Sequence, residues 1–153
     1  GTEALGVMRI EKGHAAGPEL NGQTSAYDLG MGGMISGKKD FIGYTLGLRE
    51  DLQRDNRLQM VGFKPVNPND LLLAGSHLLG LRDKATTEND QGWISSCIYS
   101  PILGHYLGIG FIKGGHNRKG ENVRAVDLVR GNDVEVEICS PHFVDPEGER
   151  LRV

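Results

Sequence analysis

The sequence has few cysteines and no long apolar run, and each shortage excludes a class of protein. Its 153 residues include only two cysteines, Cys97 and Cys139, which are too few for a disulfide-stabilised scaffold. No apolar run reaches the roughly 18 residues that a membrane-spanning helix needs. Residues 1–20 lack the basic start, apolar centre and small-residue cleavage site of a signal peptide. These absences predict a cytoplasmic protein with reduced thiols and no membrane contact.

The sequence also lacks an excess of positive charge. It has 17 Lys and Arg against 20 Asp and Glu, which gives a formal net charge of −3 at pH 7. Proteins that bind nucleic acid usually present a basic surface. The aromatic residues, 6% of the chain, do not alternate with Lys or Arg along any predicted strand, as they do in base-stacking barrels. We therefore expect no nucleic-acid partner.

The sequence contains no complete motif for nucleotide, metal or nucleophilic chemistry. Residues 32–38 have the spacing of a phosphate-binding P-loop, but Lys39 follows where a hydroxyl is needed to hold magnesium. Residues 30–32 fail as a dinucleotide fingerprint because no strand precedes them. The five histidines show no metal-ligand spacing, and neither cysteine has a basic sequence neighbour that would favour a thiolate.

What the sequence does have is glycine, turn residues and short segments of apolar alternation. It contains 23 Gly, and its length fits one domain. Short strands with a turn every ten or so residues are typical of a barrel or sandwich. We predict a mainly β protein, a small antiparallel Greek-key-type β-barrel with an irregular, helix-containing N-terminal third. The predicted strands are residues 5–11, 57–65, 76–81, 92–100, 104–112, 121–129 and 132–140.

Two segments have the clearest apolar periodicity. In residues 132–140, Val134, Val136 and Ile138 alternate with two glutamates, so these three side chains should face the core. In residues 40–54 the apolar positions lie three or four apart, which predicts a helix of about four turns with Asp40 as its N-cap. Residues 12–33 have no sustained period and should form an ordered loop with at most short helix.

Glu11 is the candidate binding residue that the local pattern suggests. It ends the apolar segment 5–11 and is followed by the start of a loop. A carboxylate can accept two parallel hydrogen bonds from an N–H and an adjacent NH₂ group, as on the edge of a guanine-like or pterin ring. The alternative interpretation is a surface Glu paired with Lys12 or Arg9.

Several segments resemble the aminomethyltransferase family, which includes the glycine-cleavage T-proteins. MRIEKG at residues 8–13 is similar to that family's Leu-Arg-hydrophobic-Glu-x-Gly segment, and GKKDFIG at residues 37–43 to its basic-then-Phe-Ile-Gly segment. Residues 92–110 resemble a run in its C-terminal barrel. The longer segments GHAAGPELNGQT (13–24), NDQG (89–92) and SPHFVDPEGERLR (140–152) resemble the α subunits of heterotetrameric sarcosine oxidases.

The resemblance implies a place in a larger enzyme. Such enzymes oxidatively demethylate sarcosine and pass the one-carbon unit to tetrahydrofolate, giving glycine, 5,10-methylenetetrahydrofolate and hydrogen peroxide. Residues 1–55 would then be part of the folate-binding region and residues 56–153 the C-terminal barrel domain. The expected partners are tetrahydrofolate, the rest of the α subunit and the other subunits, with FAD, FMN and NAD bound elsewhere in the complex.

The resemblance also assigns site residues. The family's pterin-binding Glu corresponds to Glu11, and its basic segment corresponds loosely to Lys38 and Lys39, where T-proteins tend to have Arg. These lysines could hold the anionic tail of folate or simply form a solvated face. The family's essential Asp and the flavin and nicotinamide fingerprints have no counterpart in this sequence, so we expect the chain to be inactive alone.

Two other functions remain open from the sequence. The chain could be a non-catalytic barrel that docks other subunits through residues 28–37 and the surface around Arg49, Glu50 and Arg54. It could also be part of a stand-alone T-protein-like aminomethyltransferase. The long matches at residues 13–24 and 140–152 favour the sarcosine oxidase resemblance over the second of these.

Overall fold

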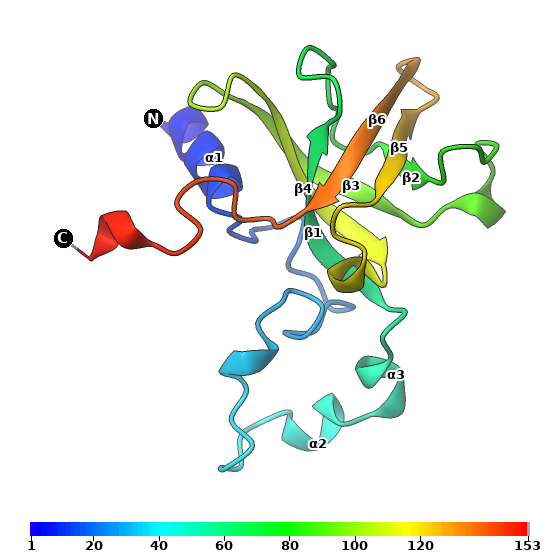
Figure 1. The fold of residues 1–153 in the computed structure, drawn as a ribbon. Coiled ribbons are helices and arrows are strands. Elements are labelled where there is room, and N and C mark those ends of the chain that lie inside the picture. Colours follow the sequence, from blue (N-terminus) through cyan, green and yellow to red (C-terminus); the bar gives the residue numbers. More distant parts are fainter. Residues whose placement is uncertain (153) are drawn as a thin grey trace.

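The computed structural model describes residues 1–152, and its main feature is a closed six-stranded antiparallel barrel (Figure 1). The strand order around the barrel is β1-β4-β3-β2-β5-β6. The consecutive strands β2, β3 and β4 are neighbours, and β1 returns to lie beside β4, which is a Greek-key arrangement. The predicted mainly β fold is therefore confirmed. The strands are β1 (Leu58–Pro65), β2 (His77–Leu79), β3 (Gly92–Ser100), β4 (His105–Lys113), β5 (Asn122–Asp127) and β6 (Asn132–Cys139).

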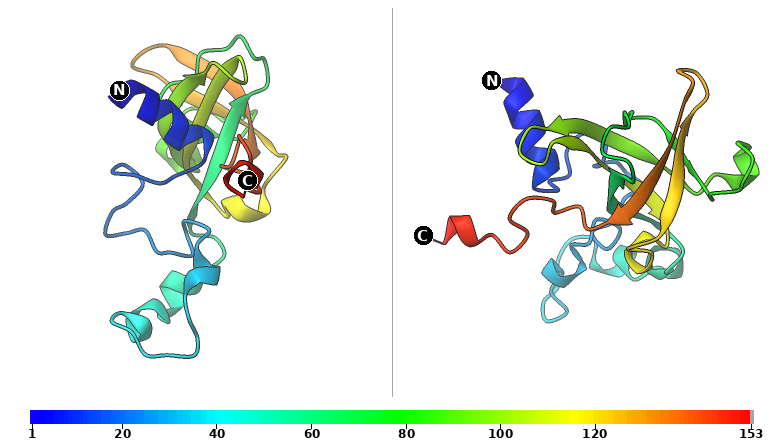
Figure 2. Two further views of the ribbon diagram at one scale, coloured as in Figure 1. Left: turned by 90° about the vertical axis from the view of Figure 1, so that its left-hand side faces the viewer. Right: turned by 45° about the horizontal axis from the view of Figure 1, so that its top comes forward.

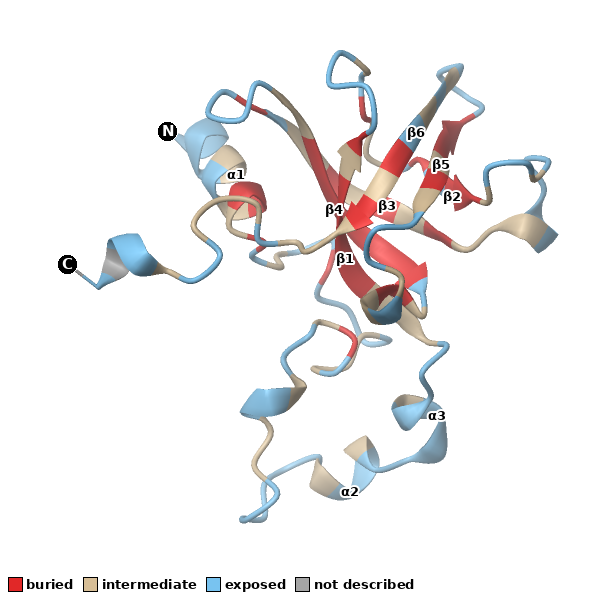
Figure 3. Ribbon diagram, in the orientation of Figure 1, coloured by how far each residue is buried: buried red, intermediate tan, exposed pale blue. Residues whose placement is uncertain are grey.

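One side of each strand fills the barrel interior, and Figure 3 colours many residues of the strands red as buried. Alternate residues of a strand point to opposite faces, so the apolar positions two apart converge on one core. The prediction for β6 holds, because Val136 and Ile138 are fully buried and Val134 packs against the same core. The fully buried members of this core are Val61, Phe63, Leu72, Leu78, Ile94, Ile112, Val123, Ala125, Val136 and Ile138.

The segment predicted as a first strand is instead a helix, α1 (Thr2–Glu11). Among its buried and half-buried positions, Ile10 and Glu11 lie three and four residues after Val7, which matches one helical face rather than a strand. The exposed Leu5 and Met8 created a misleading alternation with these residues. Ile10 packs against Leu107 and Ile109 of β4, so contact with the outside of the barrel stabilises the helix.

The single helix predicted for residues 40–54 is also wrong. The structure has two short helices, α2 (Tyr44–Gly47) and α3 (Glu50–Gln53). Gly43, with φ of 93°, precedes α2, so Asp40 is not its N-cap. Arg49 has an extended backbone and interrupts the path between the two helices. In the part of the chain that the structure describes, residues 40–54 contain no buried apolar side chain that would stabilise a longer helix against that break.

Residues 21–56, called here the outlying segment, extend away from the barrel in all three views (Figures 1 and 2). Residues 12–33 form the expected ordered loop with one short 3₁₀ turn, Gly32–Met34. Further 3₁₀ turns are Thr87–Asn89, Gly115–Asn117 and Glu149–Leu151. Across residues 1–152, none of the helices has the length and apolar character needed to cross a membrane.

Candidate functional site

Glu11 lies at the last position of α1 and is almost fully buried, with 5% of its surface exposed. Its Oε1 accepts a hydrogen bond of 2.6 Å from the Ser100 hydroxyl at the end of β3. Its Oε2 accepts no hydrogen bond from any residue that the structure describes. Glu11 is therefore not a surface residue paired with Lys12 or Arg9, because both of those cations bond elsewhere.

The turn after Glu11 ends the helix through the backbone. The Gly13 N–H donates to the Ile10 carbonyl and the His14 N–H donates to the Arg9 carbonyl, the two bonds of a Schellman motif. Gly13 has φ of 70°, a conformation that favours glycine, and a Cβ there would overlap the Pro141 carbonyl oxygen. The glycine of the MRIEKG segment is thus required by the turn that ends α1.

The C-terminal segment 140–145 crosses this turn and holds it. The backbone N–H groups of Phe143 and Val144 both donate to the Glu11 carbonyl oxygen, each at 2.9 Å. The Lys12 ammonium bonds to the Asp145 carbonyl and lies 3.5 Å from the Asp145 carboxylate. These contacts fix the backbone that carries the Glu11 side chain.

A second buried carboxylate, Glu19, lies on the same outer side of β3. Its side chain has no solvent exposure and accepts four hydrogen bonds. The hydroxyls of Ser95 and Ser96 donate to Oε1 at 2.5 and 2.8 Å. The Ala16 N–H donates to Oε2 at 2.9 Å, and the Arg9 guanidinium donates to the same oxygen at 3.3 Å. Every oxygen of this buried charge is therefore compensated.

A β-bulge explains why two consecutive serines reach one carboxylate. In a regular strand, adjacent side chains point to opposite faces of the sheet. The pairing of β3 with β4 shifts between Ile94 and Ser96, so Ser95 is an extra residue without a partner. The bulge turns the Ser95 hydroxyl toward Glu19, beside that of Ser96.

Lys38 and Lys39 lie in the outlying segment and are exposed. Figures 1 and 2 show α1 and the residues around position 39 well separated in every view. The structure does not bring these lysines next to Glu11. A ligand that contacted all three residues would have to extend along the molecule.

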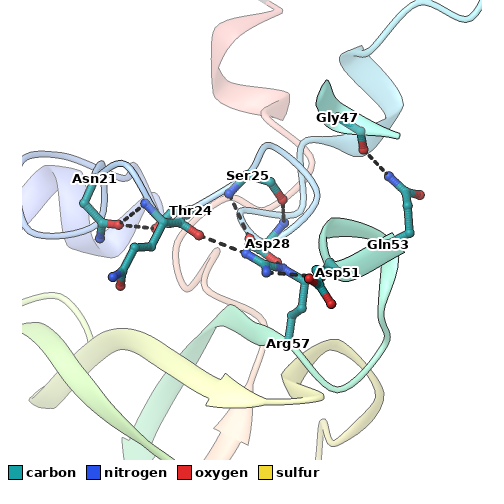
Figure 4. Close-up of polar contacts among 9 residues, drawn as sticks. Asn21, Thr24, Ser25, Asp28, Gly47, Asp51, Gln53 and Arg57 are labelled. Atoms are coloured by element: carbon teal, nitrogen blue, oxygen red, sulfur yellow. Dashed lines mark hydrogen bonds and ion pairs between the residues drawn. The ribbon is translucent and has the colours of Figure 1, made fainter. Parts of the chain in front are cut away.

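The outlying segment is joined to the barrel through a third buried carboxylate, Asp28 (Figure 4). Arg57 donates to both of its oxygens, from Nε at 2.9 Å and from a terminal nitrogen at 2.7 Å. The Ser25 N–H also donates to Asp28, and the Met60 N–H of β1 donates to its carbonyl. Burial raises the pKa of Asp28, but the hydrogen bonds from Arg57 and Ser25 outweigh burial and leave the pKa below its ordinary value.

The thiols and histidines form no reactive cluster in the described part of the chain. Burial raises the pKa of Cys139 to about 12 and also raises the pKa of Cys97, so the thiolate is disfavoured at both positions. Residues 1–152 contain no group of three or more His, Cys, Asp or Glu side chains that could hold a metal ion.

A cavity of about 620 Å³ lies on another part of the barrel. Its lining includes His77, Leu79, Asp90, Val126 and Val129, and it includes none of Glu11, Lys38 and Lys39. The cavity is therefore distinct from the residues that the sequence suggested.

Sequence reasoning missed the partners of Glu11. The Ser100 partner of Glu11 and the neighbouring Glu19, in the loop after α1, make contacts that span 89 and up to 77 positions of sequence. No local pattern reports contacts of that range. The available signal was the glycine after Glu11-Lys12, which is typical of a helix end and could have identified α1.

Comparison with known proteins supports the relationship suggested by the sequence. The family profile of the glycine cleavage T-protein C-terminal barrel domain matches residues 59–145. The chain is 42% identical over 154 residues to the sarcosine oxidase subunit alpha of Rhizobium meliloti (strain 1021), covering 100% of this chain and 16% of that protein. It is 35% identical over 154 residues to the subunit of the same name from Corynebacterium sp. (strain U-96), covering 98% of this chain and 16% of that protein.

A solved structure has the same fold. The glycine cleavage system aminomethyltransferase T from Bartonella henselae superposes with a TM-score of 0.64 at 17% identity, over 95% of this chain and 39% of that chain. The chain thus spans less than half of that structure and 16% of the length of each of the two sarcosine oxidase subunits. Because the barrel profile matches more than half of the chain, the protein belongs to the glycine cleavage T-protein C-terminal barrel family.

Proposed function

We propose that this chain is the folate-binding, T-protein-like part of a sarcosine oxidase α subunit. The whole enzyme would demethylate sarcosine oxidatively and transfer the one-carbon unit to tetrahydrofolate, forming glycine, 5,10-methylenetetrahydrofolate and hydrogen peroxide. Flavin and nicotinamide cofactors would bind in other parts of the complex. Support comes from the two relatives named sarcosine oxidase subunit alpha, which align with 98–100% of this chain.

The observation that carries the folate proposal is the state of the Glu11 carboxylate. Its Oε1 already has a donor in Ser100, and its Oε2 has no donor among the described residues. A carboxylate oxygen has two acceptor positions, so Glu11 retains the capacity for two parallel hydrogen bonds. The amino-pyrimidine edge of a pterin offers that pair of donors.

The contribution of this chain to the reaction would be positional. Tetrahydrofolate supplies the nitrogens that accept the one-carbon unit. By holding the pterin at Glu11, the chain would make the transfer effectively unimolecular, which can lower a barrier by several kcal/mol. Within this proposal, residues 1–55 belong to the folate-binding region and residues 56–153 form the barrel that supports it.

Lys38 and Lys39 have a separate place in the proposal. Both are exposed and carry positive charge, which suits the glutamate carboxylates at the anionic end of folate. Their contribution would be a screened surface attraction, worth about 1 kcal/mol or less. Replacing both with Gln should therefore weaken binding only a few-fold, and more strongly at low salt than at high salt.

The test of the folate site is Glu11→Gln in the full-length enzyme. We expect the dissociation constant of tetrahydrofolate to rise at least about 10-fold, because hydrogen bonds to a charged acceptor contribute roughly 1.5–3 kcal/mol. Flavin reduction by sarcosine, followed by stopped-flow absorbance, should be unchanged. A parallel loss of both properties would mean that Glu11 is a structural residue and would overturn the proposal.

The 153 residues alone should not transfer formaldehyde to tetrahydrofolate, because this proposal places the catalytic residues elsewhere in the enzyme. The measurement is formation of 5,10-methylenetetrahydrofolate above the uncatalysed rate. Catalysis by the isolated chain would contradict this assignment.

A second candidate function is docking of other parts of the complex. It is favoured by the exposed apolar side chains of the outlying segment, where Met34 is 82% exposed and Ile42 fully exposed. Large exposed apolar groups are common at protein interfaces. Met34→Ser combined with Ile42→Ser should then impair assembly, measured by size-exclusion chromatography, while folate binding by the remaining complex stays normal.

A further inference from the structure

We propose that Glu19 is a positioning residue for Glu11: its buried hydrogen-bond network sets how α1 lies on β3 and thereby where the Glu11 carboxylate points. This inference rests on the proposed folate site. It assigns a function to a carboxylate that contacts no part of that site directly.

The first step is the connection between the two carboxylates. Arg9 lies two residues before Glu11 on α1 and donates to both Glu19 and the Ser96 hydroxyl, the latter at 2.8 Å. Its guanidinium also donates to the His14 carbonyl, on the far side of the turn that follows Glu11. Arg9 therefore connects Glu19 to the helix that carries Glu11 and, through the His14 carbonyl, to the turn that follows Glu11.

The second step is the geometry of the two anchors on β3. Ser96 and Ser100 are four residues apart, so a strand places them roughly 13 Å apart along its length. Ser96 fixes the Arg9–Glu19 group, and Ser100 fixes Glu11. Two separated anchors determine both the position of a helix along a strand and its rotation about its own axis.

The third step is that Glu11 cannot set its own orientation. Its side chain has one hydrogen-bond partner among the described residues, Ser100, and a single bond leaves the carboxylate free to rotate about it. Recognition of a planar pterin edge needs both oxygens in one plane with the donors, and functional groups tolerate errors of only about 0.5 Å. Ser95, Ser96 and Ala16 hold the Glu19 carboxylate in place, and its bond to Arg9 then limits the rotation of α1 and supplies the missing constraint.

The variant that tests this role is Glu19→Gln in the full-length enzyme. Gln has the same shape, but it places an NH₂ group or a weaker acceptor opposite the Arg9 and Ala16 donors. We expect the dissociation constant of tetrahydrofolate to rise roughly 10-fold, since small displacements of a binding group have effects of this size. Flavin reduction by sarcosine should be unaffected.

Asp127→Asn is the matched control. Asp127 is also buried, at 8% exposure, and it accepts hydrogen bonds from Arg130 and the backbone of Val129. It lies at the end of β5, across the barrel from α1 in Figure 1. The control should leave folate affinity within about twofold of wild type, whatever it does to the melting temperature.

The double variant Glu11→Gln with Glu19→Gln separates positioning from a general loss of stability. If Glu19 acts through Glu11, the double variant binds tetrahydrofolate no more weakly than Glu11→Gln alone. If the two losses multiply, or if Glu19→Gln binds as tightly as wild type, the positioning role is wrong.

Two further outcomes are distinguishable. Should Glu19→Gln fail to fold, Ser95→Ala removes one donor to Glu19 and should weaken folate binding in the same direction by a smaller factor. Wild-type affinity in that variant would overturn the inference. If Glu11→Gln alone leaves folate binding unchanged, the proposed function fails, and the positioning role fails with it.

Discussion

The barrel and the outlying segment are stabilised in opposite ways. Ten fully buried apolar residues, drawn from strands and loops far apart in the sequence, form one core inside the barrel. In residues 21–56 the only buried side chain in the described structure is Asp28, while Met34, Ile42 and Leu46 are more than half exposed. Figure 3 shows the contrast as red strands beside a largely pale blue segment.

One chain therefore uses two different means of fixing its backbone. The barrel is held by burial of apolar surface, which is non-directional and distributed over many residues. The outlying segment is held by directional polar contacts at one place, the Asp28–Arg57 pair at the base of β1. A single substitution should therefore release the segment, whereas the barrel should respond in proportion to the apolar volume removed.

The largest effect is expected from Phe63→Ala. Phe63 is fully buried in the barrel core, and truncation of a buried Phe typically costs about 3–5 kcal/mol. The free energy of unfolding, measured by urea denaturation, should fall by that amount. The matched control is Ile42→Ala in the outlying segment, where full exposure predicts a change within about 0.5 kcal/mol. Equal losses in the two variants would abolish the contrast between the regions.

Asp28→Asn should have a smaller and more local effect. It removes the charge that Arg57 binds through two hydrogen bonds, at a cost of about 2–3 kcal/mol confined to the outlying segment. Hydrogen exchange should accelerate at residues 21–56 and stay slow in the barrel strands. Asp51→Asn is the control, because Asp51 is exposed and its ion pair with Arg54 contributes little. Accelerated exchange in the barrel would show that the two regions are not independent.

The Asp28–Arg57 pair predicts that the stability of the outlying segment depends on pH. The pKa of Asp28 is lower in the folded chain than in the unfolded chain, where Asp titrates near pH 3.9. Its contribution is therefore complete above about pH 5 and is lost as the pH falls through the folded-state pKa. Acidification should release the outlying segment of the wild-type chain, seen as lower protection factors at residues 21–56, that is, exchange rates divided into the intrinsic rate at the same pH. In Asp28→Asn this acid-dependent step should be absent.

The smallest effect is expected in the rate at which the Cys139 thiol is alkylated, which reports on the packing of the barrel. The pKa of Cys139, raised to about 12 by burial, keeps its thiolate fraction at pH 8 at least about 100-fold below that of a free cysteine. Iodoacetamide should therefore modify Cys139 slowly in the wild-type chain and in Asp28→Asn, and faster in Phe63→Ala. Rapid modification in Asp28→Asn would mean that the Asp28–Arg57 pair also supports the barrel.

The two regions also differ in how well their sequence predicted them. All six barrel strands lie within or one residue beyond predicted ranges, and β3 matches its range of 92–100 at both ends. In the N-terminal third, the strand predicted at residues 5–11 is a helix, and the helix predicted at residues 40–54 is two short ones. The apolar alternation predicted the strands correctly because each strand buries one face in the barrel core. Residues 21–56 contain no buried apolar side chain in the described structure, so no core enforces a regular spacing of their apolar residues.

The candidate site was predictable only as a single residue. The segment containing Glu11 pointed to a binding carboxylate, and its assignment to the pterin remains a proposal. Its burial, its Ser100 partner and the neighbouring Glu19 network could not be read from the sequence, where Ser95 and Ser96 look like ordinary strand residues. The bulge that turns both serines to one side arises from pairing with β4.

Local patterns in the sequence predicted the strands and the mainly β class, because apolar alternation and turn residues are properties of short segments. Tertiary structure decided the form of residues 2–11, which became a helix where packing of Ile10 against β4 outweighed an ambiguous pattern. It also decided the partners of the three buried carboxylates, since Glu11, Glu19 and Asp28 meet their donors across 89, 77 and 29 positions. A buried charge requires compensation, but only the closed barrel determines which distant groups are near enough to provide it.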